Sequence, residues 1–105
     1  SHSWTERDLA SDPDGAEVSA WLLGYGLRRL AELGEEWLAT RAHWSPEWRD
    51  AVDWSDYGVR LTAHQAKALN EELGAVLERY RRLPPAEDSR TVLYYVYSFP
   101  QGPPP

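Results

Sequence analysis

The apolar positions between residues 16 and 41 predict a long first helix. One stripe has the i, i+3, i+4 spacing of a helix face and consists of Val18, Trp21, Leu22 and Tyr25. A second stripe is offset from it and consists of Leu23, Leu27, Leu30, Trp37 and Leu38. Together they form an apolar face wider than one packing contact requires. Asp14, followed three residues later by Glu17, predicts a capping box at the start of this helix.

Three glycines interrupt this helical pattern, and each costs about 1 kcal/mol in a helix interior. They allow two interpretations. One is a kink or break of the helix at Gly34. The other is the close approach of another helix at Gly24 and Gly26.

A short helix is predicted within residues 43–52. Ser45 is a suitable N-cap, Pro46 suits the first helical position, and Glu47 places negative charge in the first turn. Trp44 and Trp48 then lie one turn apart.

A second long helix is predicted from Ala63 to about Arg82. Thr62 and Gln65 have the spacing of a capping box at its start. Glu78 and Arg82 are placed as a favourable i, i+4 ion pair. The apolar stripe of this helix consists of Ala66, Leu69, Leu73, Val76, Leu77 and Tyr80.

Two strands are predicted, at residues 57–62 and 91–99. Alternate side chains of a strand fall on opposite faces, and both faces of the second strand are apolar or aromatic. One face carries Val92, Tyr94 and Val96. The other carries Leu93, Tyr95, Tyr97 and Phe99. These elements predict an α+β fold, with two main helices and a short helix packed on a small β-sheet.

The two predicted strands can be arranged in the sheet in two ways. The unit of strand, helix and strand fits a right-handed parallel crossover. The alternative is an antiparallel pairing completed by the segment around Trp4, and the sequence alone does not choose between them. We favour a small mixed or antiparallel sheet with its helices on one face. The second face of 91–99 then needs a cover, because exposed apolar faces mark interfaces or grooves. A second copy of the chain is the simplest cover, so we expect a homodimer in which the helix at 16–41 takes part.

A chain of 105 residues is expected to form one domain. It contains no Met, and Ser1–His2 resembles a tag remnant, so we expect a piece of a longer protein. Residues 101–105 are Gly and Pro apart from Gln101 and should be a disordered tail. The absence of Cys fits a reducing compartment, and no apolar run approaches ~18 residues, so we expect a cytoplasmic protein without a membrane span.

The net charge of −6 argues against nucleic acid as a direct binding partner. A protein that holds nucleic acid by itself needs a basic stripe to neutralise phosphates. This chain has none, so contact with DNA would require another domain.

Aromatic residues form the most notable candidate site, since the chain has six Trp and six Tyr. The candidate ligand-binding set consists of Trp21, Tyr25, Trp37, Trp44, Trp48, Trp54 and Tyr57. One interpretation is an aromatic core and dimer interface. The other is a pocket for a flat or cationic small molecule, which nearby carboxylates would favour. Those carboxylates belong to Glu47, Asp50, Asp53 and Asp56.

Catalytic and metal signals are weak. His43 and Glu47 could supply two metal ligands, but a site needs three or four that converge. The serines lie in turn or cap contexts, and no phosphate loop or nucleophile motif is present. We therefore expect no enzyme activity, no metal and no cofactor.

The order of features resembles the C-terminal half of winged helix-turn-helix transcriptional regulators of the ArsR type from actinobacteria. The resemblance covers nearly the whole chain and rests on an ordered set of segments: "SW" at 3–4, "EEWLATRAHW" at 35–44, "SPEWRDAV" at 45–52, "RLTAHQAKALNEELGAVLERYR" at 60–81 and "SFP" at 98–100.

This resemblance implies a DNA-binding winged helix-turn-helix upstream of Ser1, a homodimer that binds two half-sites, and a domain that dimerises and senses a ligand. The best-known members of that family sense metals through thiolates, which this chain lacks. No ligand residues carry over position by position. The alternative function is a stand-alone protein that sequesters a small molecule and never contacts DNA.

Overall fold

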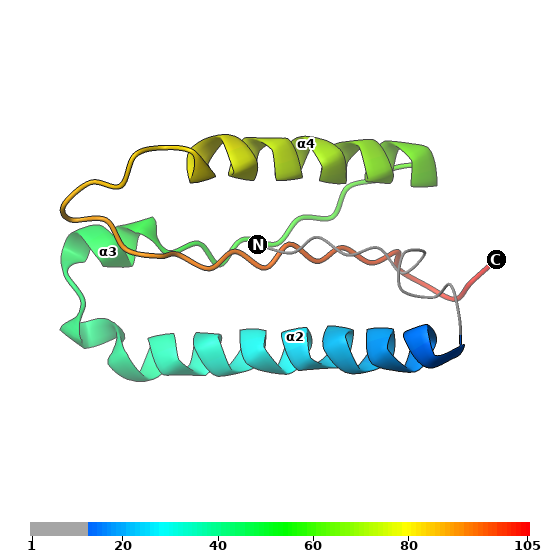
Figure 1. The fold of residues 1–105 in the computed structure, drawn as a ribbon, viewed down its shortest axis with the longest axis horizontal. Coiled ribbons are helices and arrows are strands. Elements are labelled where there is room, and N and C mark those ends of the chain that lie inside the picture. The colour runs from blue at the N-terminus through cyan, green and yellow to red at the C-terminus, as the bar shows by residue number, and fades with distance from the viewer. Residues whose placement is uncertain (1–12) are drawn as a thin grey trace. The chain divides into compact units, whose positions relative to one another are not determined.

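The computed structural model describes residues 13–105 and is helical there (Figure 1). Its elements are α2 (Pro13–Thr40), the 3₁₀ turn η1 (Arg41–His43), α3 (Pro46–Ala51) and α4 (Ala63–Arg81). The chain divides into two compact units, which we call unit 1 (residues 1–53) and unit 2 (residues 54–105).

Helix α2 is longer than the sequence pattern predicts at its start and unbroken in its middle. It begins at Pro13, so Asp14 lies inside the helix and is not its cap, in keeping with the preference of Pro for the first helical turn. The break considered at Gly34 does not occur, because α2 continues to Thr40. Apolar residues on either side of Gly34 continue the same helix faces, and one glycine costs too little to end such a helix.

The corner between α2 and α3 forms as its sequence predicts. Ser45 is the N-cap of α3, where its Oγ accepts a hydrogen bond from the Trp48 backbone N–H at 3.2 Å. Pro46 occupies the first helical turn, where its missing N–H removes no helical bond. The turn η1 is too short to hold a packed face of its own, and it redirects the chain between the two helices.

Helix α4 is confirmed within one residue of its predicted end. Both bonds of its capping box are present. The Gln65 N–H donates to Thr62 Oγ1 at 3.1 Å, and the Thr62 N–H donates to Gln65 Oε1 at 2.9 Å. At the other end, Glu78 pairs with Arg81 at 3.1 Å rather than with Arg82, which is the C-cap.

The predicted α+β fold is wrong for the part of the chain that the structure describes, because residues 13–105 contain no β-strand and no sheet. Residues 57–62 and 91–99 run as extended chain without a strand ladder (Figure 1). Alternation of side chains is a local property that favours extended backbone. A strand also needs a partner backbone for its hydrogen bonds, and the sequence pattern does not supply one. The alternative partner segment around Trp4 lies outside the described residues.

Neither unit has a hydrophobic core among residues 15–105. No hydrophobic side chain there is buried, and the one buried residue is Ser19, which is 4% exposed. Large apolar side chains instead remain exposed along α2, α4 and both extended segments.

Candidate functional site

Three tryptophans gather at the corner of unit 1, and we call them the tryptophan cluster: Trp37, Trp44 and Trp48. The rings of Trp37 and Trp44 lie 5.5 Å apart at 40°, and those of Trp44 and Trp48 lie 6.4 Å apart at 70°. These are the tilted and edge-on arrangements that aromatic pairs prefer. All three residues are half-buried. Trp44 is the central member and joins α2 to α3.

Polar contacts fix the central ring of this cluster. The Trp44 Nε1–H donates to Thr40 Oγ1 at 3.2 Å, and the Thr40 hydroxyl donates to the Glu36 carbonyl oxygen at 2.9 Å. An indole N–H removed from water needs such an acceptor. The last turn of α2 therefore holds Trp44 in place, and the Ser45 cap holds the start of α3 next to it.

The rest of the predicted ligand-binding set is not joined to this cluster. Trp21 and Tyr25 stack on each other, with centroids 5.8 Å apart and planes at 17°. Because Trp21 lies sixteen positions before Trp37 on one helix, the two are about 24 Å apart along the axis. Trp54 and Tyr57 belong to unit 2 and are 62% and 85% exposed. The five aromatic residues of the set that belong to unit 1 thus occupy two separate places on that unit.

Charges around the tryptophan cluster are mixed. Glu47 and Asp50 of α3 are exposed, as are Arg41 of η1 and Arg49 of α3. The negative charges of Glu47 and Asp50 are therefore offset by the positive charges of Arg41 and Arg49 in the same short stretch of chain. A cation would gain less from this environment than a list of the acidic residues alone suggests.

The residues predicted to form the dimer interface lie on the extended segment of unit 2. Rings of Tyr95 and Tyr97 are 5.9 Å apart, and those of Tyr97 and Phe99 are 6.4 Å apart, so these alternate residues share one face. Of the seven residues, Tyr95 is half-buried and the other six are exposed. The exposed members are Val92, Leu93, Tyr94, Val96, Tyr97 and Phe99. The segment is tied to α4 where Asn70 Nδ2 donates to Ser98 Oγ at 3.2 Å.

A shallow hollow that sequence reasoning missed lies at the end of α4. Its volume is about 250 Å³, and it is lined by Arg79, Tyr80 and Leu83. The Arg79 guanidinium carbon lies 5.6 Å from the centre of the Tyr80 ring. Ligand pockets usually have volumes of about 300–1,000 Å³, so this hollow is smaller than a typical ligand pocket. The partial negative charge at a helix C-terminus also opposes an anion, the ligand that Arg79 would otherwise attract.

Two further features are absent from the described residues, a metal site and a membrane span. Between residues 13 and 105, no three His, Asp or Glu side chains come together in a way that could hold a metal ion. His43 and Glu47 thus have no third ligand there. Over the same residues, none of the helices has the length and apolar character needed to cross a membrane.

Comparison with known proteins finds no matching family model, no matching curated protein and no matching solved structure. The resemblance to ArsR-type regulators therefore stays a prediction from the sequence.

Proposed function

We propose that this chain is a non-catalytic dimerisation and effector-binding domain of a transcription regulator. Its partner is a second copy of itself. The DNA-binding winged helix-turn-helix would be a separate domain outside residues 1–105. The dimerisation part is the better supported of the two roles.

One observation carries the proposal: 22 large hydrophobic side chains are exposed among residues 15–105, and none is buried. Soluble monomers rarely leave extended apolar patches in water. Burying one large apolar side chain stabilises a protein by about 1.5–3 kcal/mol. A surface of this kind therefore gains strongly from association, and obligate homodimer interfaces resemble a domain core that has been divided in two.

The regulatory role rests on the resemblance to ArsR-type regulators and on the negative charge of the chain. A domain without a basic stripe has no means of neutralising phosphates. It can still control DNA binding through the geometry of the dimer, because two recognition helices must match two half-sites. A ligand that binds one dimer geometry better than another shifts the population toward it.

The tryptophan cluster is the best place for the effector, for which we infer a flat or cationic aromatic compound. Half-buried indole faces offer stacking and cation–π contacts without a large rearrangement. Titration of the protein with a library of aromatic cations, followed by tryptophan fluorescence, tests this role. A saturable change that is lost in Trp48→Ala supports it. If no compound gives a response, only the dimerisation role remains.

Sedimentation equilibrium at micromolar concentration tests dimerisation directly. We expect a mass twice that of the 12.0 kDa chain, with dissociation on dilution. A monomer at all concentrations contradicts the proposal. A monomer that nevertheless binds aromatic cations would favour the sequestering protein instead.

A further inference from the structure

The face of α2 divides into parts that differ in exposure. Its middle, which includes Leu22, Leu33 and Trp37, is half-buried. Beside it runs a row that we call the leucine stripe: Leu23, Leu27, Leu30 and Leu38. These side chains are 40%, 49%, 40% and 53% exposed. The stripe extends about 22 Å along the helix axis. One helix thus has a row of exposed leucines beside its half-buried middle.

The leucine stripe is complementary to itself when two copies of α2 lie antiparallel. With the two-fold axis between Leu30 and Ala31, Leu27 of one copy lies at the height of Gly34 in the other. Leu30 then lies at the height of Ala31, and Leu23 at the height of Leu38. Large side chains therefore meet small ones near the centre, which is how closely packed helices interdigitate. In a parallel pair each leucine would meet the same leucine instead.

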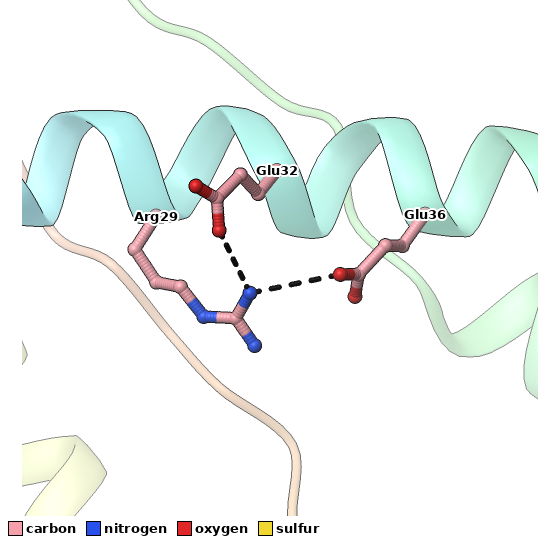
Figure 2. Close-up of polar contacts among 3 residues, drawn as sticks. All are labelled: Arg29, Glu32 and Glu36. Atoms are coloured by element: carbon pink, nitrogen blue, oxygen red, sulfur yellow. Dashed lines mark hydrogen bonds and ion pairs between the residues drawn. The ribbon is translucent and has the colours of Figure 1, made fainter.

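Charges on α2 favour the same orientation. Arg29 is engaged within its own helix, with Nη1 3.0 Å from Glu32 Oε2 and 3.6 Å from Glu36 Oε1 (Figure 2). Arg28 and Glu35, by contrast, have no ion-pair partner among the described residues. They lie seven positions apart, about 10 Å along the axis, which is too far for a direct pair within one helix.

Antiparallel pairing brings these two free charges together. Arg28 and Glu35 lie on the same side of α2, next to Ala31 and Leu38 at the edge of the leucine stripe. In an antiparallel pair, this side of one helix faces the same side of the other helix. Arg28 then lies within about 3 Å, along the axis, of the partner's Glu35, and the symmetry gives a second such pair. In a parallel pair the two copies of this side of α2 lie at opposite edges of the interface, so Arg28 and Glu35 would not meet each other across it.

From these observations we propose that the dimer is built on α2, with the two leucine stripes packed antiparallel around an axis between Leu30 and Ala31 and with reciprocal Arg28–Glu35 ion pairs. This inference rests on the proposed dimerisation role and specifies which helix, which orientation and which register it uses.

Cysteine cross-linking tests the register cleanly, because the natural chain has no Cys. Facing residues of packed helices come within the Cα separation of about 4.4–6.8 Å that a disulfide requires. Ala31→Cys, next to the axis, should form a disulfide dimer under mild oxidation. Leu23→Cys and Leu38→Cys should cross-link when mixed but not separately. Glu32→Cys lies almost as close to the axis as Ala31 but on another side of α2, so it is the matched control and should not cross-link.

A charge exchange tests the orientation independently of disulfides. Arg28→Glu and Glu35→Arg should each raise the dimer dissociation constant by about tenfold, since each places like charges side by side. The double variant restores opposite charges across the interface and should recover most of the affinity. An additive double variant would contradict the reciprocal pairs.

The outcomes separate this inference from the proposed function. A dimer in sedimentation that lacks the Ala31 cross-link overturns the α2 register and leaves dimerisation standing. Cross-linking of Leu23→Cys alone overturns the antiparallel orientation. A monomer overturns both the α2 register and the proposed dimerisation.

Discussion

Unit 1 and unit 2 contain similar lengths of chain, but different interactions stabilise their structures. Unit 1 has a corner at which two helices are joined by tilted and edge-on indole contacts, by the hydrogen bonds of the Thr40 hydroxyl and by an N-cap. Unit 2 consists of one helix between two extended segments, and the hydrogen bond from Asn70 to Ser98 ties one of them to it. Of the 22 exposed large hydrophobic residues, seven belong to unit 1 and fifteen to unit 2.

This difference shows how far local interactions alone can build a fold. Residues of the tryptophan cluster lie within twelve positions of one another, so closing their contact costs little chain entropy. The extended segments of unit 2 are separated by a whole helix and have apolar surface on both faces. Unit 2 therefore leaves more apolar surface uncovered than unit 1, and substitutions in the two units should have different consequences.

Replacing Trp44 with Ala should have the largest effect on the free energy of unfolding. It removes both ring contacts and the hydrogen bond to Thr40 at once. We expect a loss of about 2 kcal/mol, below the ~3–5 kcal/mol typical of a fully buried Trp, because Trp44 is half-buried. Urea unfolding at one fixed protein concentration measures it, since the stability of a dimer depends on concentration.

Two controls sharpen this result. Trp44→Phe keeps an aromatic ring but loses the N–H donor, and should cost about 1 kcal/mol. Trp54→Ala in unit 2 removes a side chain that is 62% exposed and should change stability by less than about 0.5 kcal/mol. Equal losses at Trp44 and Trp54 would remove the distinction between the units.

Sequence reasoning succeeded where structure depends on neighbours along the chain. Ser45, Pro46 and the Thr62–Gln65 pair predicted helix starts that the structure confirms, because caps act within one turn. It failed for residues 57–62 and 91–99. Their alternation predicts extended backbone, but the choice of a pairing partner is a long-range property.

The same limit applies to the candidate site. Trp44 and Trp48 were predicted one turn apart, and Trp37 joins them through the corner. Residue type alone groups Trp21 with them, although helix geometry places it about 24 Å from Trp37. The hollow at Arg79 and Tyr80 has no recognisable signal in the sequence beyond the arginines that end α4.

Substitution of the N-cap residues Ser45 and Thr62 compares how much a helix cap contributes to stability in each unit. Thr62→Ala in unit 2 breaks the bond from the Gln65 N–H and should cost about 1 kcal/mol in the free energy of unfolding. Ser45→Ala in unit 1 should cost slightly less, because the tryptophan cluster still holds the start of α3. Urea unfolding checks both, and Thr62→Ser should restore stability. A larger loss at Ser45 than at Thr62 would contradict this order.

Glycine to alanine changes should stabilise both long helices by small amounts. A Cβ added at Gly74 of α4 meets no atom within 4 Å, so Gly74→Ala should gain about 0.5–1 kcal/mol from helix propensity. At Gly24 of α2, the Cβ would lie 3.1 Å from Arg28 Nη1. The flexible end of Arg28 must move, so the gain at Gly24 should be smaller. Thermal unfolding of the two variants side by side measures the difference, and a loss at Gly74 would mean that its face is covered.

The smallest expected effect concerns the bond between Asn70 and Ser98. Both residues are exposed, so Asn70→Ala should change global stability by less than about 0.5 kcal/mol. Amide exchange of residues 91–99 should nevertheless become faster, because local opening reports contacts that the global free energy does not. Ser98→Ala should speed exchange equally, and the double variant should add nothing further, since both changes remove one shared bond. Additive effects would show that Asn70 and Ser98 hold the segment through separate contacts, and unit 2 would then be tied together by more than this one bond.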